Sequence, residues 1–381
     1  QIVPPFDAEI AEAIKATPPA DQVPMNDDLI EAVDPRDEYV ACASALASGE
    51  ASAREDLRIV LTAMHGVGAA ITSRVLAEAG FSNVSLVAAQ TDPDPDFPTV
   101  PFPNPEEAGA LDMAIEQARE QGADLIIAVD PDADRCALAV PDPASETGWS
   151  PLSGDQIGSL LGEFLASRGM KGSLANSIVS SRLLSRIARA HGLEHHTTLT
   201  GFKWIARAPG LGFGYEEAIG FCPDPAHVRD KDGIATSVVA ASLVAALKAQ
   251  GRSVWDELER LARLHGLHVS SPLTFRVEEI EQIASGMARL RAQPPSVLAG
   301  SPVVEVSDLS QGYRGLPPTD GVLVLTEAGD RVIARPSGTE PKLKCYLEVI
   351  LPVAEGEPLP WEQARERLDA IKGAFAEIIG L

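Results

Sequence analysis

The sequence is poor in cysteine, in basic residues and in long apolar runs, and each scarcity excludes a class of protein. Its four cysteines, Cys42, Cys136, Cys222 and Cys345, are far apart and follow no metal-binding spacing, so we expect reduced thiols in a cytoplasmic protein. The 31 basic residues against 55 acidic ones give a net charge of −24, whereas nucleic-acid binding needs a basic face. No apolar run approaches the roughly 20 residues of a membrane span. We therefore expect neither a nucleic acid nor a membrane as partner.

The start of the chain lacks a methionine and any recognisable signal peptide. We therefore expect the 381 residues to begin part-way through a longer gene product. Residues 1–34 show little pattern beyond a short amphipathic helix over residues 7–16, and we interpret them as a remnant or arm of a preceding domain. The length predicts about two to four domains. A hydrophobic content of 45% and a charged content of 23% are typical of a globular protein with a packed core.

Residues 125–135 concentrate the chemistry of the chain. An apolar run, Leu-Ile-Ile-Ala-Val, is followed by Asp-Pro-Asp-Ala-Asp-Arg. The run predicts a buried strand, because it is apolar without alternation, and Pro131 ends that strand because proline lacks an N–H and fixes φ. The carboxylates of Asp130, Asp132 and Asp134 can then curl toward one point. Their mutual repulsion favours a hard divalent cation, and oxygen-only ligands favour Mg²⁺.

Other interpretations of this stretch compete with a magnesium site. A solvated acidic turn is the simplest, since Asp is common in turns. A calcium loop needs Gly at its sixth position and Glu at its twelfth, where Arg135 and Pro141 stand. A strand followed by Asp-x-Asp also resembles the haloacid-dehalogenase phosphatases, in which the first Asp is the nucleophile. Those proteins usually carry Thr or Val where this chain has Asp134.

Most of the chain alternates strand and helix patterns, which predicts βαβ units and largely parallel sheets. Helices are expected over residues 105–121, 154–167 and 361–379; Asn104 is the cap of the first, and Pro105 is at its first position. After residue 266 the pattern changes to paired antiparallel strands and two helices. The predicted division is residues 1–34, a remnant; 35–148, an α/β domain with the Asp loop; 149–265, a second α/β domain; and 266–381, an α+β domain.

Residues 212–220, Gly-Phe-Gly-Tyr-Glu-Glu-Ala-Ile-Gly, follow a predicted strand. The adjacent carboxylates of Glu216 and Glu217 suit bidentate acceptance from vicinal sugar hydroxyls, and the glycines let a ligand approach the backbone. The alternative is a solvated acidic loop.

Residues 335–342, Arg-Pro-Ser-Gly-Thr-Glu-Pro-Lys, gather many hydrogen-bond donors in a short stretch. They offer a guanidinium, two hydroxyls, a glycine N–H and an ammonium, which together make a phosphate cradle. The pattern differs from a Walker loop. The candidate phosphate ligands are Arg335, Ser337, Gly338, Thr339 and Lys342.

In this order, the three stretches resemble the metal, sugar and phosphate loops of the α-D-phosphohexomutases, the phosphoglucomutase/phosphomannomutase superfamily. The resemblance extends from the family's second domain to its fourth. It implies successive three-layer α/β/α domains with mixed sheets and a smaller α+β C-terminal domain. It also implies Mg²⁺ on the three Asp residues, a charge-assisted contact from Arg135 and sugar binding by Glu216 and Glu217. Residues 200–204, Thr-Gly-Phe-Lys-Trp, are similar to a family segment in which Lys203 is a candidate general acid/base.

The reaction that the resemblance implies is phosphoryl transfer between the 1- and 6-positions of a hexose phosphate, through a phosphoserine and a bisphosphate intermediate. The expected partners are sugar phosphates and sugar bisphosphates, bound by a monomer or homodimer. Ala218 stands where the muscle type carries Ser, so this loop looks like that of the bacterial and phosphopentomutase-related branch. A phosphopentomutase, a dehalogenase-type Mg²⁺-dependent phosphatase and a non-catalytic sugar-phosphate binder are the alternatives.

The nucleophile that the resemblance implies is a Ser in a Thr-Ala-Ser-His-Asn-Pro-like segment of the family's first domain. None of the seven His residues in this sequence directly follows a Ser. We therefore expect the phosphoserine domain to lie outside these residues, and we expect this chain to bind substrate with little turnover.

Overall fold

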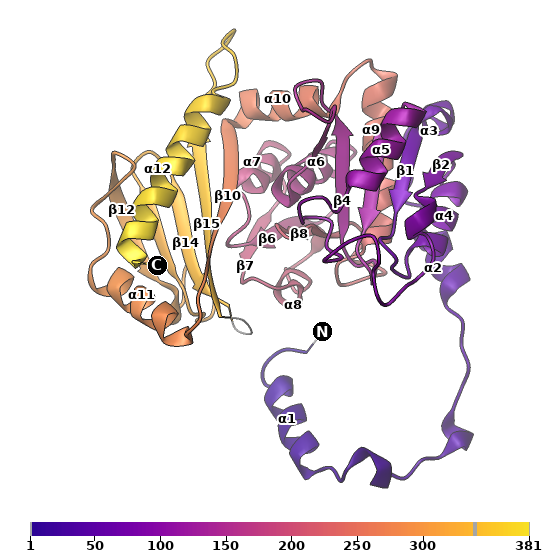
Figure 1. Ribbon diagram of the computed structural model, residues 1–381, viewed down its shortest axis with the longest axis horizontal. Coiled ribbons are helices and arrows are strands. Elements are labelled where there is room, and N and C mark those ends of the chain that lie inside the picture. The colour runs from indigo at the N-terminus through magenta and orange to yellow at the C-terminus, as the bar shows by residue number, and fades with distance from the viewer. Residues whose placement is uncertain (1, 338–340, 381) are drawn as a thin grey trace.

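A computed structural model describes residues 2–337 and 341–380, which form three β-sheets with helices packed against them (Figure 1). The first two sheets share one continuous core of buried apolar side chains, and the third sheet has a core of its own.

The first sheet holds the predicted strand of the Asp loop at its centre. Its strand order is β2-β1-β3-β4-β5. Strands β1, β2 and β3 are parallel, β4 is antiparallel to β3, and β5 is antiparallel to β4. Strand β3 is buried along its whole length, as its unbroken apolar sequence predicts. The strands are β1 Arg58–Thr62, β2 Asn83–Leu86, β3 Leu125–Val129, β4 Cys136–Pro141 and β5 Trp149–Pro151. The helices before and within this sheet are α2 Arg36–Ser44, α3 Ala51–Asp56, α4 Ala69–Glu78 and α5 Asp112–Gln121.

The helix expected over residues 105–121 is wrong in its first half, because α5 begins only at Asp112. The Asn104 side chain accepts the N–H of Glu106, and successive short turns follow it. Gly109 adopts φ +82°, a left-handed conformation that interrupts a helical backbone. Residues 102–111 are therefore a loop, which reaches the cleft described below.

The second sheet has the order β7-β6-β8-β9, with three parallel strands and an antiparallel edge strand. Its strands are β6 Ser173–Ser177, β7 His195–Thr198, β8 Leu211–Glu216 and β9 Gly220–Cys222. Its helices are α6 Gly154–Ser167, α7 Leu183–Ala190, α8 Phe202–Ile205, α9 Gly233–Ala249 and α10 Val254–His265. Helix α9 contacts β3 and β4 of the first sheet as well as α6 and β9 of this one. It is therefore buried on nearly all sides, which explains why it is apolar all round.

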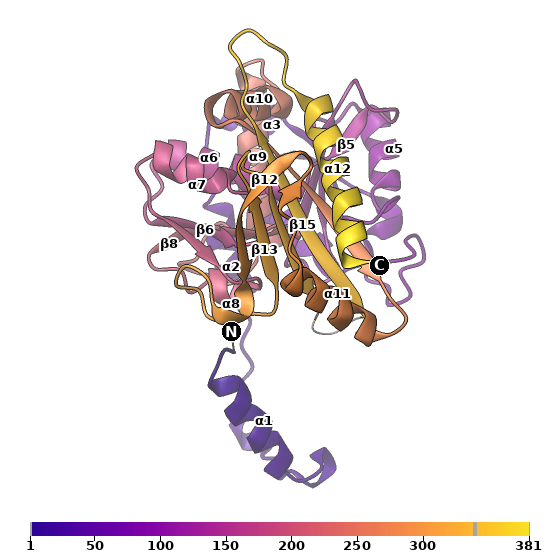
Figure 2. The ribbon, with the colours of Figure 1, turned by 90° about the vertical axis from the view of Figure 1, so that its left-hand side faces the viewer.

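The third sheet is antiparallel, with the order β10-β15-β14-β13-β12-β11. Figure 2 shows helices α11 and α12 lying across its outer face, so its other face is turned toward the second sheet. The strands are β10 Leu267–Arg276, β11 Val297–Leu298, β12 Ser301–Asp308, β13 Val322–Thr326, β14 Arg331–Pro336 and β15 Lys342–Leu351. The helices are α11 Ile280–Ala292 and α12 Trp361–Ile379.

The first part of the chain extends away from these sheets in both ribbon views (Figures 1 and 2). Helix α1, Phe6–Ala16, has no buried residue. Short 3₁₀ helices lie at Ala20–Gln22, Asp27–Leu29, Ala88–Gln90 and Leu309–Gln311. Within residues 2–337 and 341–380, no single helix is long and apolar enough to cross a membrane; α9 and α10 reach that length only as a pair bent by 91°.

Candidate functional site

The Asp loop lies between the end of β3 and the start of β4. Ala133 adopts φ +59°, and this left-handed residue turns the backbone so that the loop folds over on itself. One ligand atom from each of Asp130, Asp132 and Asp134 lies within 4.8 Å of the others. The structure thus brings together the three carboxylates that the sequence analysis selected, in an arrangement that could hold a metal ion.

Two neighbouring backbone segments pack against the Asp loop so closely that they require glycine. A Cβ on Gly66 would overlap the Pro131 backbone, and a Cβ on Gly233 would overlap carbonyl oxygens of the loop. The Gly233 N–H also donates to the Ala133 carbonyl over 3.1 Å. The turn around Gly66 and the start of α9 therefore hold the loop from two sides, and its shape is set by the protein fold itself.

The charges of the Asp loop are partly neutralised by two cations. Both Asp130 oxygens bond to Arg135: Oδ1 accepts the backbone N–H at 3.0 Å and Oδ2 lies 2.6 Å from Nε. Burial raises the pKa of Asp130, and the hydrogen bonds and charge of Arg135 oppose that rise. The Lys231 ammonium lies 2.6 Å from Asp134 Oδ2, whereas Asp132 is exposed. Arg135 is therefore held by the Asp loop itself, and its catalytic, charge-assisted contact stays a prediction.

Glu216 ends β8, Glu217 follows it in the turn, and Ile219 at φ +53° leads the chain back into β9. The environments of the two glutamates differ. Burial and the charge of Glu217 raise the pKa of Glu216 to about 7, against the attraction of Lys231. Glu217 accepts hydrogen bonds from two serine hydroxyls and lines a cleft. The two carboxylates are therefore not equivalent, although both are predicted to bind sugar hydroxyls.

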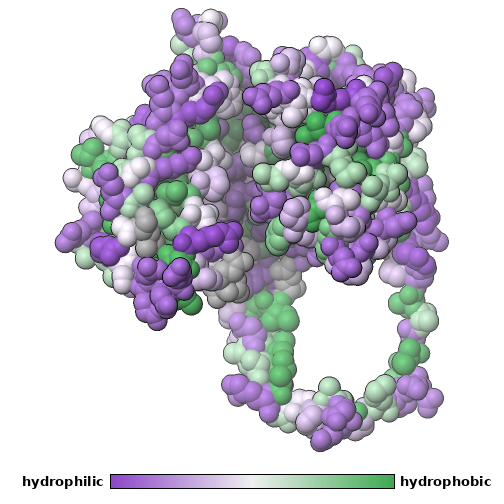
Figure 3. Space-filling model, in the orientation of Figure 1, coloured by the Kyte–Doolittle hydropathy of each residue, from purple (hydrophilic) through white to green (hydrophobic). Residues whose placement is uncertain are grey.

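That cleft has a volume of about 760 Å³ and lies between the third sheet and the rest of the molecule. Figure 3 shows a recess between these two parts of the surface. The third sheet contributes basic side chains to its lining, and the parts of the chain that belong to the first two sheets contribute carboxylates. The charged lining residues are Glu106, Glu107, Asp155, Glu217, Arg276, Lys342 and Lys344. Such a lining can hold a ligand that has an anionic group at one end and hydroxyls at the other.

A second cavity, of about 590 Å³, adjoins the Asp loop and is lined by Asp130, Asp132 and Arg135. Phe102 and Asn104 line both this cavity and the cleft. The loop over residues 102–111 therefore connects the carboxylate cluster to the cleft.

The described residues of the predicted phosphate cradle lie at the end of β14 and the start of β15. Arg335 pairs with Lys344 in the register of these strands, and the Ser337 N–H donates to the Lys342 carbonyl over 2.9 Å. Lys342 lines the cleft. Gly338 and Thr339 lie outside the described residues.

Lys203 lies in α8, and its ammonium is 5.9 Å from the centre of the Trp204 ring. The neighbouring Phe202 ring lies 6.0 Å from the Lys231 ammonium, which pairs with the Asp loop. The Thr-Gly-Phe-Lys-Trp segment is thus placed beside the carboxylate cluster through Phe202. A role for Lys203 itself stays a prediction.

Several residues of the cleft escaped the sequence analysis. Lys344 and Tyr346 follow Lys342 at alternate positions of β15 and point to the same side, which is the side facing the cleft. The alternation is visible in the sequence, but the prediction of a phosphate loop over residues 335–342 includes no strand after it, whereas β15 begins at Lys342. Glu106 and Glu107 were assigned to the first turn of a helix instead of to the cleft.

Comparisons with known proteins agree with this geometry. Residues 37–144, 153–264 and 275–358 match three phosphoglucomutase/phosphomannomutase domains: α/β/α domain II, α/β/α domain III and the C-terminal domain. A probable phosphomannomutase of Haemophilus influenzae is 43% identical over 359 residues, which cover 91% of this chain and 71% of that protein. The chain belongs to the phosphoglucomutase/phosphomannomutase family. The predicted family and fold class are therefore confirmed, while the domain boundaries stay a prediction.

Other members of the phosphoglucomutase/phosphomannomutase family are longer than this chain. A Staphylococcus aureus phosphoglucomutase is 34% identical over 323 residues, and the match covers 78% of this chain but 58% of that protein. Two crystal structures share the fold. A putative phosphomannomutase from Thermus thermophilus has a TM-score of 0.66 at 23% identity, over 90% of this chain and 66% of that one. The phosphoglucomutase parafusin from Paramecium has a TM-score of 0.68 at 19% identity, over 92% and 64% of the two chains.

Proposed function

We propose that this family member acts in phosphoryl transfer between the 1- and 6-positions of a hexose phosphate. One observation carries the proposal: the carboxylate cluster and the mixed-charge cleft adjoin through Phe102 and Asn104. One end of a single sugar phosphate can therefore lie at the carboxylate cluster, where Asp130, Asp132 and Asp134 would hold a metal ion, while its other end lies in the cleft. The relatives named phosphomannomutase and phosphoglucomutase support the same reaction.

The carboxylate cluster fits Mg²⁺, because it offers only hard oxygen ligands. Asp130, Asp132 and Asp134 would hold the ion, which when bound would neutralise charge on the transferred phosphoryl group. Arg135 opposes the rise in the pKa of Asp130 that burial causes, because its hydrogen bonds and its charge favour the ionised carboxylate.

The other predicted residues would bind the sugar phosphate. Glu217, together with the adjacent Glu216, would accept hydrogen bonds from sugar hydroxyls in the cleft. Arg335, Ser337 and Lys342, with Gly338 and Thr339, would hold the phosphate that does not react. Lys203 would donate and accept the proton of the reacting oxygen.

The dehalogenase-type phosphatase is disfavoured by the surroundings of Asp130. Its side chain is fully buried, and both carboxylate oxygens are bonded to Arg135. A nucleophile must instead be free to approach phosphorus. A phosphopentomutase stays the second candidate, because Ala218 lines the cleft where the muscle type carries Ser.

The test is a titration of the chain with glucose 1-phosphate, ribose 1-phosphate and glucose, each with Mg²⁺. We expect glucose 1-phosphate to bind more tightly than glucose, and tighter binding of ribose 1-phosphate would instead favour the pentose reaction. Release of inorganic phosphate would contradict a mutase and support a phosphatase.

Turnover tests a further part of the proposal. Because no His of the printed sequence follows a Ser, we expect these 381 residues to convert glucose 1-phosphate to glucose 6-phosphate very slowly, even with Mg²⁺ and a bisphosphate primer. A rate in the ordinary enzyme range of about 1–10³ s⁻¹ would show that another residue carries the phosphoryl group.

A further inference from the structure

One oxygen of the Glu217 carboxylate is held by a pair of buried serine hydroxyls. Glu217 Oε2 lies 3.0 Å from Ser177 Oγ and 2.9 Å from Ser180 Oγ. The two hydroxyls also lie 2.8 Å from each other, and both serines are 1% exposed. The two hydroxyl groups have two protons for three contacts. Only one proton can lie between the two hydroxyls, so when both protons are used among these groups at least one is donated to the carboxylate. Within this cluster Oε2 is engaged, which leaves Oε1 to face a ligand in the cleft.

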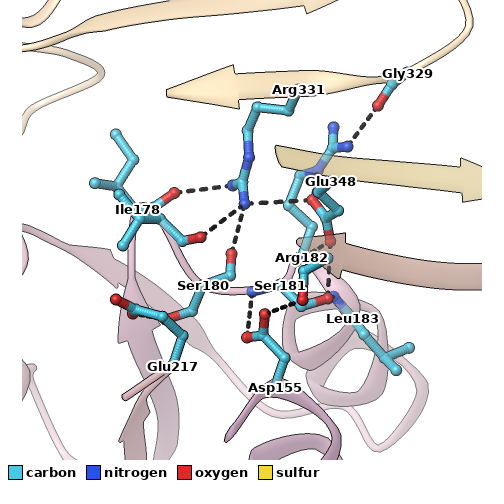
Figure 4. A network of polar contacts seen from close by, with 12 residues as sticks. Asp155, Ile178, Ser180, Ser181, Arg182, Leu183, Glu217, Gly329, Arg331 and Glu348 are labelled. Atoms are coloured by element: carbon cyan, nitrogen blue, oxygen red, sulfur yellow. Dashed lines mark hydrogen bonds and ion pairs between the residues drawn. The ribbon is translucent and has the colours of Figure 1, made fainter. Parts of the chain in front are cut away.

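The position of Ser180 is fixed from the third sheet. Arg331 at the start of β14 is buried, and its guanidinium points across to the loop that follows β6 (Figure 4). It donates to the carbonyls of Ile178 at 2.9 Å, Val179 at 3.3 Å and Ser180 at 2.6 Å. Three hydrogen bonds from one rigid planar group fix the backbone that carries the Ser180 hydroxyl.

The next two residues of the same loop are held by Glu348 of β15. Its Oε1 accepts the Ser181 hydroxyl and the Arg182 N–H, each at 2.8 Å, and its Oε2 lies 2.6 Å from Arg182 Nε. The Ser181 N–H in turn donates to Asp155 at the start of α6 over 2.7 Å. Figure 4 shows these contacts as one network between the second and third sheets.

The strands that hold this loop also carry the predicted phosphate ligands. Arg331 pairs with Glu348 in the register of β14 and β15, and Arg335 pairs with Lys344 further along. Since side chains two apart share one face of a strand, the buried anchor and the basic lining of the cleft lie on the same sheet face. The Glu217 carboxylate and the predicted phosphate ligands are thus positioned by the same pair of strands, β14 and β15.

We propose that Ser177 and Ser180 are positioning residues for sugar binding, which orient the Glu217 carboxylate toward the cleft. Arg331 and Glu348 fix the position of the loop that carries Ser180. This inference rests on the proposed function, in which Glu217 accepts sugar hydroxyls. The ligand class is a sugar phosphate, because the oriented oxygen and the cationic strand ends face the same cavity. Neither serine contacts the sugar; each acts through Glu217.

The experiment is a double-mutant cycle with glucose 1-phosphate as the titrant. Ser180→Ala and Ser177→Ala should each weaken binding about tenfold, the effect of losing one hydrogen bond to a charged group. Ser177→Thr keeps a hydroxyl and suits a strand, so it should restore most of the affinity. In a Glu217→Gln background, Ser180→Ala should cause little further loss, because its effect passes through the missing carboxylate.

Ser159→Ala is the matched control. Ser159 is also a fully buried serine, and its hydroxyl bonds to no other described group, so this variant should bind like the wild type. An equal loss from Ser180→Ala with and without Glu217 would overturn the proposal, since a merely structural serine would act in both backgrounds. Unchanged binding in both Ser→Ala variants would overturn it as well.

A crystal structure of the Ser177→Ala/Ser180→Ala protein separates this inference from the proposed function. We expect the Glu217 carboxylate to leave its present orientation even without a ligand. If it stays in place, the positioning role is wrong whatever the sugar titration gives. If it moves but no sugar phosphate binds to the wild type, the proposed function fails and the positioning of Glu217 stands.

Discussion

The Lys231 ammonium lies 2.6 Å from the Asp134 carboxylate, so a residue just before α9 holds one of the three candidate metal ligands. The pair is half-buried, with side chains 20% and 32% exposed. A divalent cation entering the cluster must share Asp134 with this ammonium. Like charges at such a distance repel strongly in a partly dry site.

This pairing predicts opposite effects of two substitutions on Mg²⁺ binding. Asp132→Asn removes a ligand charge and should weaken binding, whereas Lys231→Gln removes the competing cation and should strengthen it. Calorimetric titration with Mg²⁺ measures both effects. Asp28→Asn, on the exposed 3₁₀ helix at Asp27–Leu29, is the control and should change nothing. Unchanged affinity in both site variants would place the metal elsewhere.

Arg335→Ala should weaken binding of glucose 1-phosphate far more than binding of glucose. Arg335 lies near the end of β14 and pairs with Lys344, and a lost charge-assisted contact costs about 1.5–3 kcal/mol. Titration of both ligands tests this prediction. Arg314→Ala, which removes a surface guanidinium of the same domain that is 70% exposed, should leave both affinities unchanged. Equal losses for the two ligands would give Arg335 a structural role only.

Local sequence patterns predicted the regular elements well. The expected helices over 154–167 and 361–379 have the same bounds in the structure, because each has a continuous apolar face and a clear start. The helix expected from residue 105 failed at Gly109, where a positive φ interrupts it. The three Asp residues converge as their spacing and Pro131 predicted, since those signals act over a few residues.

Local sequence patterns could not predict contacts between segments that are far apart in the chain. Arg182 and Glu348 are 166 residues apart, and their ion pair depends on how the second and third sheets meet. Nothing local marks Arg331 as buried, because arginine is normally a surface residue. Lys231 likewise looks like an ordinary charged residue until the start of α9 is placed against the Asp loop.

Glu348 predicts a loss of stability in acid. Burial alone would raise its pKa, but Arg331 and Arg182 outweigh that effect and lower it to about 2 from 4.5. A carboxyl whose pKa is lower in the folded state stabilises the fold above the unfolded pKa, and that stability disappears as the pH falls through the folded pKa. The wild type should therefore lose roughly 3 kcal/mol from this group between pH 4.5 and pH 2.

Glu348→Gln should remove most of this dependence on pH, because an amide does not titrate in that range. Urea unfolding of both proteins at a series of pH values gives the difference between them. Glu259→Gln breaks a surface pair with Arg263 whose side chains are 46% and 37% exposed, and this variant should follow the wild-type curve. Parallel curves for wild type and Glu348→Gln would mean that Glu348 is not held ionised by its arginines.

Gly66→Ala should destabilise the chain and weaken Mg²⁺ binding together. A Cβ at this position would overlap the backbone of Pro131, and backbone atoms cannot swing aside as a flexible side chain can. The Asp loop must shift, which costs about 1–3 kcal/mol and spoils the convergence of its carboxylates. Gly373→Ala in α12 is the matched control, because a Cβ there meets nothing within 4 Å and alanine favours a helix by about 1 kcal/mol. Urea unfolding should therefore show opposite changes for the two variants, and calorimetry should show weaker Mg²⁺ binding for Gly66→Ala alone. Normal Mg²⁺ affinity in Gly66→Ala would mean that the turn does not hold the Asp loop in its binding shape.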